Sequence, residues 1–315
     1  MVREIKTIAV FGAGKMGNGI AQLFAAGGYP VYLWAFDEHE QRRALEIIRQ
    51  NLGLLVENGI LEETRVPGIL EKITITTDHD LAASKADMAI ECILENMELK
   101  QSFFKNLDRL TAPDVVLCTN TSVMSVTEIA SKSEHKERIV GTHFWNPPFL
   151  IPLVEVVKTV YVADGVAEHI CKVLENVGKK PIIAKKDVPG FIANRMQNAL
   201  GREAVSIVAN GIADPKDVDI AVKYSFGMRL GSIGPIEQID SIGADLCLNI
   251  GSYIYPHLEN STQASPLLKE KVENNELGFK TGGVGIQKWS PEAMKAFNER
   301  TIRDLIRVGK ALDMF

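Results

Sequence analysis

Several features are scarce or missing in this sequence of 315 residues, and each absence removes a class of protein. The four cysteines are widely scattered, with no CxxC pair and no zinc-ligand spacing, so reduced thiols are expected and a disulfide framework or zinc site is not. No apolar run reaches the roughly 18 residues that a membrane span needs. The beginning of the chain carries Arg3, Glu4 and Lys6 and then enters a predicted strand, which is unlike a signal peptide. We therefore expect a cytoplasmic protein that does not contact a membrane.

Basic residues are also fewer than acidic ones, with 35 lysines and arginines against 40 aspartates and glutamates. The net charge is −5, which argues against nucleic acid as the main partner. The sequence contains no internal repeat and no low-complexity tract. Its hydrophobic fraction of 46% and charged fraction of 24% are ordinary for a globular protein. A small-molecule ligand is therefore the expected partner.

The clearest pattern is a strand, a glycine turn and a helix at the beginning of the chain. Ile8–Phe11 is a short apolar run typical of a strand buried on both faces. Gly12 suits the tight turn, Gly14 lets a pyrophosphate approach the backbone, and Gly17 allows close packing of the helix on the strand. The N-terminus of that helix would face the phosphates with free N–H groups. The predicted dinucleotide-binding residues of this turn are Gly12, Gly14, Lys15, Met16 and Gly17.

The order of predicted elements indicates two domains. Short apolar strands alternate with helices up to residue 186, which predicts an α/β Rossmann-type, doubly wound sheet. The break Asp187–Gly190 follows, and beyond it helical periodicity dominates, including one long predicted helix over Ile236–Tyr255. We therefore predict a dinucleotide-binding domain over 1–186 and an all-helical domain over 187–315. The apolar helix faces of the second domain predict a homodimer.

The second strand, Val31–Trp34, bears on the choice of cofactor. Dinucleotide folds usually place an acid at the end of this strand to bind the adenosine ribose. Here Asp37 is the first acid, slightly late, and it is either the ribose ligand or a surface turn residue. Arg42 and Arg43 are a solvated helix face or a partner for a 2′-phosphate. The expected cofactor is NAD, with NADP not excluded.

One histidine stands apart from the other five. His143 ends an apolar strand and opens a stiff loop with two prolines, a setting that suits a general base. Glu155 lies in the apolar run LVEVV, where a carboxylate is costly to bury without a partner, so it is a candidate for orienting the imidazole. From these residues alone, His143 is either catalytic or structural. A metal is not expected, because no second histidine lies at ligand spacing.

Seven segments, taken in order, resemble the L-3-hydroxyacyl-CoA dehydrogenase family over nearly the whole chain. They are GAGKMGNGIA (Gly12–Ala21), ENMELK (Glu95–Lys100), NTS (Asn120–Ser122), GTHFWNPP (Gly141–Pro148), LVEVVK (Leu153–Lys158), KDVPGFIANR (Lys186–Arg195) and GFKTG (Gly278–Gly282). The resemblance implies an oxidoreductase of fatty acid metabolism. It would transfer a hydride between NAD and carbon 3 of a 3-hydroxyacyl-CoA such as 3-hydroxybutyryl-CoA, and its helical domain would bind substrate and form the dimer.

The resemblance also implies roles for individual residues. His143 would be the base and Glu155 its orienting carboxylate, while Ser122 and Asn194 would hold the substrate oxygen. The implied cofactor-binding residues beyond the glycine turn and Asp37 are Glu95, Lys100, Asn120 and Asn146.

Three departures from the family pattern leave the substrate open. The family usually has an acid at the position of Ala35, lysines in the helix corresponding to Gln50–Gly59, and an acid and aromatics where this chain reads GGVGIQKW (Gly282–Trp289). The run Asn146–Pro152 resembles a branch acting on free hydroxy acids or hydroxymethyl rings. The alternatives are therefore a dehydrogenase of a free 3-hydroxy acid or related alcohol, and a dinucleotide-binding protein with little turnover.

Overall fold

The computed structural model describes residues 3–314 and divides into two compact units. The N-terminal unit ends at Arg195 and the C-terminal unit begins at Met196. The predicted boundary at 186/187 lies nine residues earlier, in the segment before the first long helix of the second unit, and stays a prediction. No helix among the described residues is long and apolar enough to cross a membrane.

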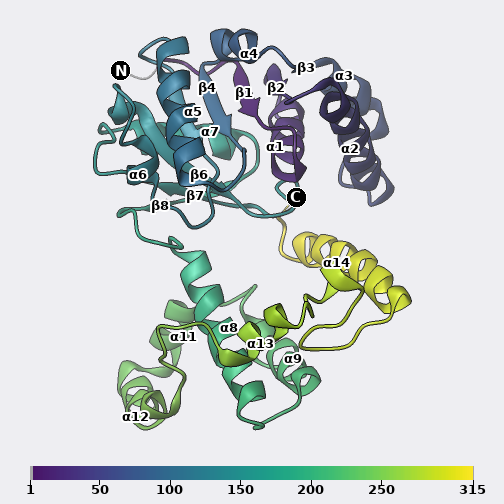
Figure 1. The fold of residues 1–315 in the computed structure, drawn as a ribbon, viewed down its shortest axis with the longest axis vertical. Helices are drawn as coiled ribbons and strands as arrows, with labels where there is room; N and C mark the ends of the chain where they lie inside the picture. The colour runs from purple at the N-terminus through teal and green to yellow at the C-terminus, as the bar shows by residue number, and fades with distance from the viewer. Residues whose placement is uncertain (1–2, 315) are drawn as a thin grey trace. The chain divides into compact units, whose positions relative to one another are not determined.

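An eight-stranded sheet forms the middle of the N-terminal unit, in the order β3-β2-β1-β4-β5-β6-β7-β8 (Figure 1). Its strands are β1 (Ile8–Phe11), β2 (Val31–Trp34), β3 (Ile73–Thr76), β4 (Met88–Glu91), β5 (Val116–Thr119), β6 (Ile139–Phe144), β7 (Leu153–Val157) and β8 (Lys180–Ala184). The order reverses at β1, as a doubly wound sheet requires, so the α/β prediction is confirmed. All pairs are parallel except β6–β7, which is antiparallel and which the sequence pattern did not indicate.

Helices cover this sheet. They are α1 (Lys15–Ala26), α2 (Glu38–Glu57), α3 (Val66–Glu71), α4 (His79–Lys85), α5 (Met97–Leu110), α6 (Val126–Ala130) and α7 (Val166–Asn176). A buried apolar cluster joins β1, β4, β5 and β6 to α4, α5 and α6, and includes Phe11, Phe104, Leu107, Leu117 and Ile129. The central strands are buried along their whole length, which explains their continuous apolar runs.

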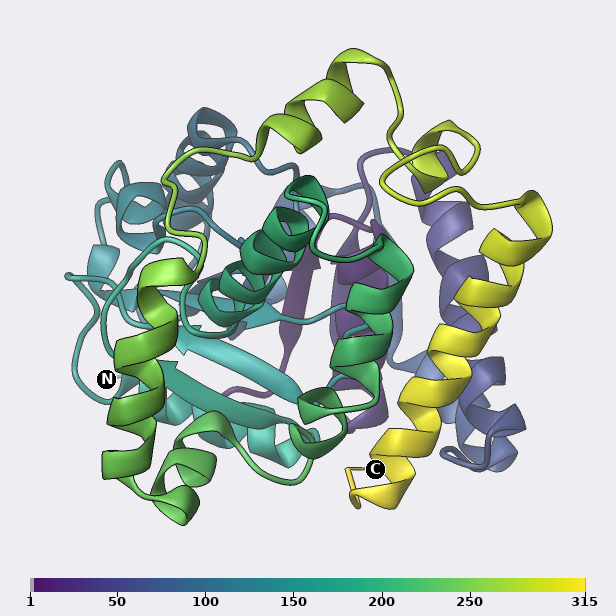
Figure 2. The same ribbon diagram turned by 90° about the horizontal axis from the view of Figure 1, so that it is seen from below.

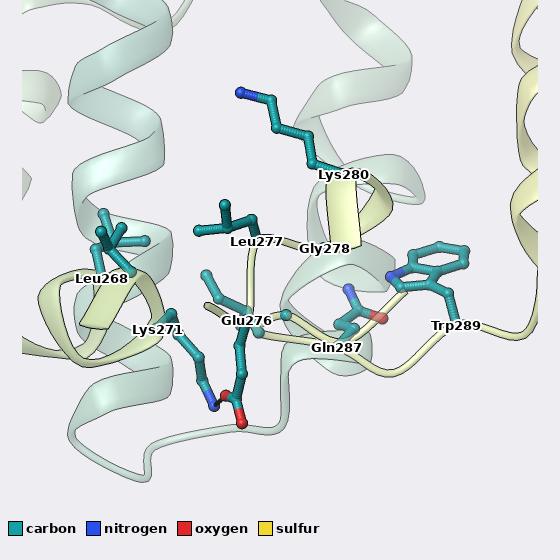
Figure 3. A pocket seen from close by; sticks show the side chains of 11 residues that line it. Leu268, Lys271, Glu276, Leu277, Gly278, Lys280, Gln287 and Trp289 are labelled. Atoms are coloured by element: carbon teal, nitrogen blue, oxygen red, sulfur yellow. Dashed lines mark hydrogen bonds and ion pairs between the residues drawn. The ribbon is translucent and has the colours of Figure 1, made fainter. Parts of the chain in front are cut away.

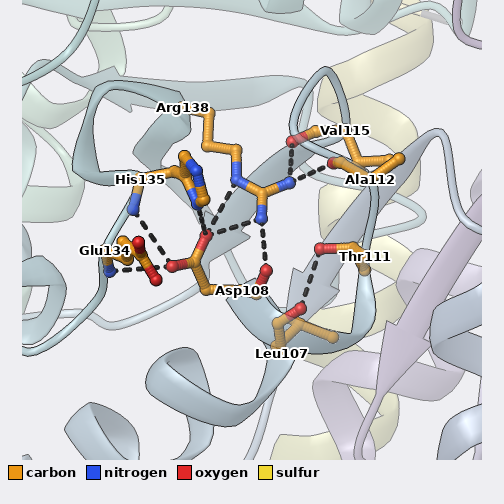
Figure 4. A network of polar contacts seen from close by, with 8 residues as sticks. All are labelled: Leu107, Asp108, Thr111, Ala112, Val115, Glu134, His135 and Arg138. Atoms are coloured by element: carbon orange, nitrogen blue, oxygen red, sulfur yellow. Dashed lines mark hydrogen bonds and ion pairs between the residues drawn. The ribbon is translucent and has the colours of Figure 1, made fainter.

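A buried ion pair joins α5 to Arg138, the residue directly before β6. Arg138 donates from Nε and Nη2 to Asp108 Oδ1 at 3.0 and 2.5 Å, and also to the backbone oxygens of Asp108, Ala112 and Val115 (Figure 4). Asp108 Oδ2 accepts the backbone N–H groups of Glu134 and His135. These bonds hold the pKa of Asp108 below its ordinary value although burial alone would raise it.

The C-terminal unit is helical among its described residues, as predicted (Figures 1 and 2). Its helices are α8 (Ala193–Ala209, begun in the first unit), α9 (Pro215–Lys223), α10 (Phe226–Arg229), α11 (Pro235–Ile242), α12 (Ala244–Ile254), α13 (Pro266–Glu273) and α14 (Pro291–Ala311). The prediction of a single helix over Ile236–Tyr255 is wrong, because this stretch forms the two helices α11 and α12. The stretch is interrupted at Gly243, whose φ of 96° lies in the left-handed region that favours glycine.

Candidate active site

His143 and Glu155 face each other across the antiparallel pair of strands. His143 lies near the end of β6, and its register partner on β7 is Glu155. His143 Nδ1 lies 2.7 Å from Glu155 Oε2, and both side chains are buried. The candidate pairing from the sequence is therefore present as a direct contact, and the antiparallel register produces it.

This contact fixes which imidazole nitrogen is left for chemistry. An ionised carboxylate only accepts hydrogen bonds, so His143 Nδ1 carries the proton and Nε2 keeps its lone pair. The rings of Trp145 and Phe191 pack beside the imidazole, with centroids 5.3 and 5.7 Å away. Trp145 Nε1 also donates to Glu155 Oε2 at 3.3 Å. The arrangement holds the imidazole in one tautomer and one orientation.

The other oxygen of Glu155 binds the beginning of α8. Glu155 Oε1 accepts the backbone N–H groups of Ile192 and Ala193 at 2.9 and 3.0 Å. Burial alone would raise the pKa of Glu155, yet the hydrogen bonds from His143 and these two N–H groups hold it below its ordinary value. The carboxylate therefore stays ionised at neutral pH, where it can stabilise a protonated imidazole.

The lowered pKa of Glu155 predicts a pH dependence of stability. An acid whose pKa is lower in the folded protein than in the unfolded chain adds to the free energy of unfolding. This addition is complete at a pH above the pKa in the unfolded chain. It is lost as the pH falls through the pKa in the folded protein. Urea denaturation should therefore find Glu155→Gln less stable than wild type at pH 7. The difference should shrink progressively as the pH falls below about 4.5, the ordinary value. A constant difference across this range would contradict the assignment.

A buried lysine, Lys179, forms hydrogen bonds with the backbone of the loop that follows His143. Lys179 Nζ donates to the backbone oxygens of Pro148 and Ile151 at 2.5 and 2.8 Å. Burial lowers the pKa of Lys179 to about 8. The loop begins with a cis peptide between Asn146 and Pro147, and Asn146 is exposed on it. Lys179 therefore anchors the loop that follows His143.

Ser122 and Asn194, 72 residues apart in sequence, meet in the structure. Asn194 Nδ2 donates to the backbone oxygen of Ser122 at 2.9 Å. The backbone N–H of Ser122 donates to Glu95 Oε1 at 3.2 Å, and the same oxygen accepts from Thr121 Oγ1. Hydrogen bonds thus bring together three residues predicted for the site: Glu95 after β4, Ser122 after β5 and Asn194 in the first turn of α8. Their roles stay predictions.

Lys100 lies inside a buried ionic network. Its Nζ is 2.6 Å from Glu91 Oε1 and 3.3 Å from Glu95 Oε2. Glu91 is fully buried at the end of β4 and also accepts from Thr119 Oγ1. Because the Lys100 side chain is 1% exposed, it reaches the site through Glu95. Sequence reasoning assigned no role to Glu91, although the signal resembled the one used for Glu155, an acid among the apolar residues of a strand.

The glycine turn has the shape that a pyrophosphate needs. A Cβ on Gly17 would lie 1.8 Å from the Gly12 carbonyl oxygen, so strand and helix can approach this closely only with glycine. A Cβ on Gly14 would meet nothing within 4 Å, which leaves open space over the backbone. Gly14 is the N-cap residue of α1 and offers no side-chain cap. The first turn of α1 holds no acid, so its N–H groups are available to an anion. The exposed Lys15 and the half-buried Met16 begin α1.

The remaining predicted residues have partners within the protein. Asn120 Oδ1 accepts the backbone N–H of Phe144 at 2.8 Å, which ties the ends of β5 and β6 together. Asp37 Oδ1 accepts the backbone N–H of Glu40 at 2.7 Å and caps α2. Asp37 therefore has a helix-capping role, and its contact with a ribose stays a prediction.

A separate hollow lies within the C-terminal unit and contains none of the predicted site residues. It is lined by residues between 268 and 289, including Gly278 and Lys280 of the GFKTG stretch. Figure 3 shows Lys271 and Glu276 pointing toward each other, with Nζ and Oε2 2.5 Å apart, while Lys280 points the opposite way. Gln287 Nε2 donates to Asp219 Oδ2 at 3.0 Å and ties this stretch to α9.

Family models match both units of the chain. Residues 7–188 match the NAD binding domain of 3-hydroxyacyl-CoA dehydrogenase, and residues 190–288 match the C-terminal domain of the same enzyme. The helix α14 lies beyond both matches.

Two relatives illustrate the range of the similarity. The chain is 35% identical over 280 residues to a probable 3-hydroxybutyryl-CoA dehydrogenase of Bacillus subtilis, covering 89% of this chain and 96% of that protein. It is 32% identical over 309 residues to 5-formyl-3-hydroxy-2-methylpyridine 4-carboxylate 5-dehydrogenase of Mesorhizobium japonicum, covering 98% and 99%.

Solved structures show the same two kinds of neighbour. A 5-formyl-3-hydroxy-2-methylpyridine 4-carboxylic acid 5-dehydrogenase, described as NAD⁺-dependent, superposes with a TM-score of 0.91 at 32% identity, over 98% of this chain and 99% of that chain. An (S)-3-hydroxybutyryl-CoA dehydrogenase of Ralstonia eutropha superposes with a TM-score of 0.75 at 30% identity, over 91% and 100%.

Proposed function

Because the chain belongs to the 3-hydroxyacyl-CoA dehydrogenase family, we propose that it oxidises the 3-hydroxyl group of a 3-hydroxyacyl-CoA such as 3-hydroxybutyryl-CoA. The cofactor is NAD, which accepts the hydride when bound. The observation that carries the proposal is the oriented base, His143 on Glu155, at the same edge of the sheet as the glycine turn.

The protein residues have separate tasks in this reaction. Oxidation of the alcohol to a ketone requires loss of the hydroxyl proton, and His143 Nε2 takes it. Glu155 stabilises the imidazolium that results. Ser122 and Asn194 hold the substrate oxygen, and their mutual hydrogen bond supports that assignment. The ionic network of Lys100 and Glu95 positions Ser122.

A second candidate substrate is a free hydroxy acid or a hydroxymethyl ring. It is favoured by the similarity to the pyridine carboxylate dehydrogenase, whose structure superposes with a TM-score of 0.91, against 0.75 for the (S)-3-hydroxybutyryl-CoA dehydrogenase. The segment Gln50–Gly59, which includes the end of α2, contains no lysine. This lack also favours a substrate without CoA.

An absorbance assay separates these candidates. NADH consumption should be followed with acetoacetyl-CoA, with a panel of free 3-oxo acids, and with an aromatic aldehyde carboxylate. Turnover with the CoA ester alone supports the main proposal, and turnover with the free acids alone supports the second. Binding of NADH without turnover of any substrate would support the third alternative, a dinucleotide-binding protein with little turnover. The joint presence of His143, Glu155, Ser122 and Asn194 argues against that alternative.

We also propose a homodimer formed through the C-terminal unit, in a cytoplasmic protein of fatty acid metabolism. Five large apolar side chains of α12 are exposed in the single chain: Leu246 (47%), Leu248 (69%), Ile250 (51%), Tyr253 (79%) and Ile254 (43%). Apolar faces of this kind are typical of protein interfaces.

The dimer is tested by sedimentation. At micromolar concentration the sedimenting particle should have twice the 34.7 kDa mass of one chain, because burial of these side chains is favourable. A 34.7 kDa particle under these conditions would refute the dimer.

A further inference from the structure

The end of β2 lacks the acid that selects NAD in many dinucleotide folds. Ala35 occupies the position, and its side chain is fully buried. No carboxylate can act from that residue. The question is therefore which group of this chain distinguishes NAD from NADP.

The carboxylate of Glu40, in the first turn of α2, lies at the end of β2. Glu40 Oε2 accepts the backbone N–H of Phe36, the residue directly after Ala35, at 2.7 Å. The backbone N–H of Glu40 in turn donates to Asp37 Oδ1 at 2.7 Å. Asp37 caps α2 through the Glu40 N–H, and the bond from Phe36 holds the Glu40 carboxylate over the end of β2.

The position is next to the dinucleotide turn. The backbone N–H of Gly12 donates to Trp34 O at 3.1 Å, and the N–H of Ala35 donates to Thr76 O at 2.9 Å. Gln41 Nε2 donates to Ile75 O at 2.7 Å and fixes the beginning of α2 against β3. The segment that presents the Phe36 N–H is therefore held rigidly beside the glycine turn.

The surrounding charges are mainly negative. Asp37, Glu38 and Glu40 lie together in the cap and first turn of α2. Arg42 Nη1 lies 3.5 Å from Glu38 Oε2 along the helix, so its charge is partly neutralised there. Arg43 is exposed on the same helix.

We propose that Glu40 is the specificity residue that excludes NADP(H). A 2′-phosphate at the end of β2 would need the free Phe36 N–H and the positive end of α2, which are the groups that bind anions. Glu40 already occupies that N–H, and its charge repels a phosphate. The proposal rests on the NAD-linked function above and adds the origin of its selectivity.

The test is binding of NADH and NADPH in the absence of substrate, followed by isothermal titration calorimetry. Glu40→Gln keeps the length of the side chain and an oxygen for the Phe36 N–H but removes the charge. The ratio of Kd for NADPH to Kd for NADH should fall by about tenfold, while Kd for NADH changes by less than about threefold. Glu40→Ala also frees the N–H and should lower the ratio at least as far.

Glu38→Gln is the matched control, because it removes the same charge from the same turn without touching Phe36. It should leave the ratio within about twofold of wild type. An unchanged ratio in both Glu40 variants, or an equal fall in Glu38→Gln, would overturn the proposal. Thermal melting of each variant reports whether the helix cap is retained. Failure of wild type to bind NADH would instead contradict the proposed function.

Discussion

His143→Gln should lower kcat by about 100-fold or more while leaving the fold and NADH binding intact. Glutamine is close in size and can still donate to Glu155 Oε2, so the contact that His143 makes at 2.7 Å has a replacement. It cannot take a proton from a hydroxyl group. Steady-state kinetics in the oxidation direction, together with NADH titration, measure the two effects separately.

The control for this variant is His257→Gln, which makes the same chemical change at an exposed histidine of the C-terminal unit. It should keep wild-type kcat. Near-normal kcat in His143→Gln would remove this residue from the mechanism.

Arg138→Met should destabilise the protein by about 3–5 kcal/mol, because it leaves a buried carboxylate without its cation. The guanidinium makes all of its hydrogen bonds to Asp108, Ala112 and Val115 inside the protein, and methionine replaces none of them. Urea denaturation at pH 7 measures the loss.

Arg109→Met is the matched control, because Arg109 is the exposed neighbour of Asp108 on α5. It should change stability by no more than about 0.5 kcal/mol. The double variant Asp108→Asn with Arg138→Met should recover part of the loss, since the uncompensated charge is gone. Equal losses from Arg138→Met and Arg109→Met would refute the role of the buried pair.

Much of the sheet could be predicted because buried parallel strands leave a simple signal. Ile8–Phe11 and Val31–Trp34 have the predicted bounds. The short helix α4 was not predicted, since its seven residues offer too little periodicity and it begins at a polar cap, Asp78. The break at Gly243 was missed because the apolar periodicity continues through it on both sides.

For the site, the sequence supplied candidates but not contacts. His143 and Glu155 were singled out by their places in apolar strands, yet only the antiparallel register of β6 and β7 sets them opposite each other. A parallel sheet, as the alternation of elements suggested, would have given no such pairing. Similarly, nothing in the sequence singled out Glu40, because only the folded beginning of α2 brings its carboxylate to the Phe36 N–H.

Glu155 divides its two oxygens between two structural partners, and this has an evolutionary consequence. One oxygen holds the imidazole and the other holds the backbone where α8 begins. A descendant that lost its chemistry would be free to replace His143, but replacement of Glu155 would also release two backbone N–H groups at the exit from the sheet. In a lineage that has become inactive, we therefore expect the glutamate to outlast the histidine.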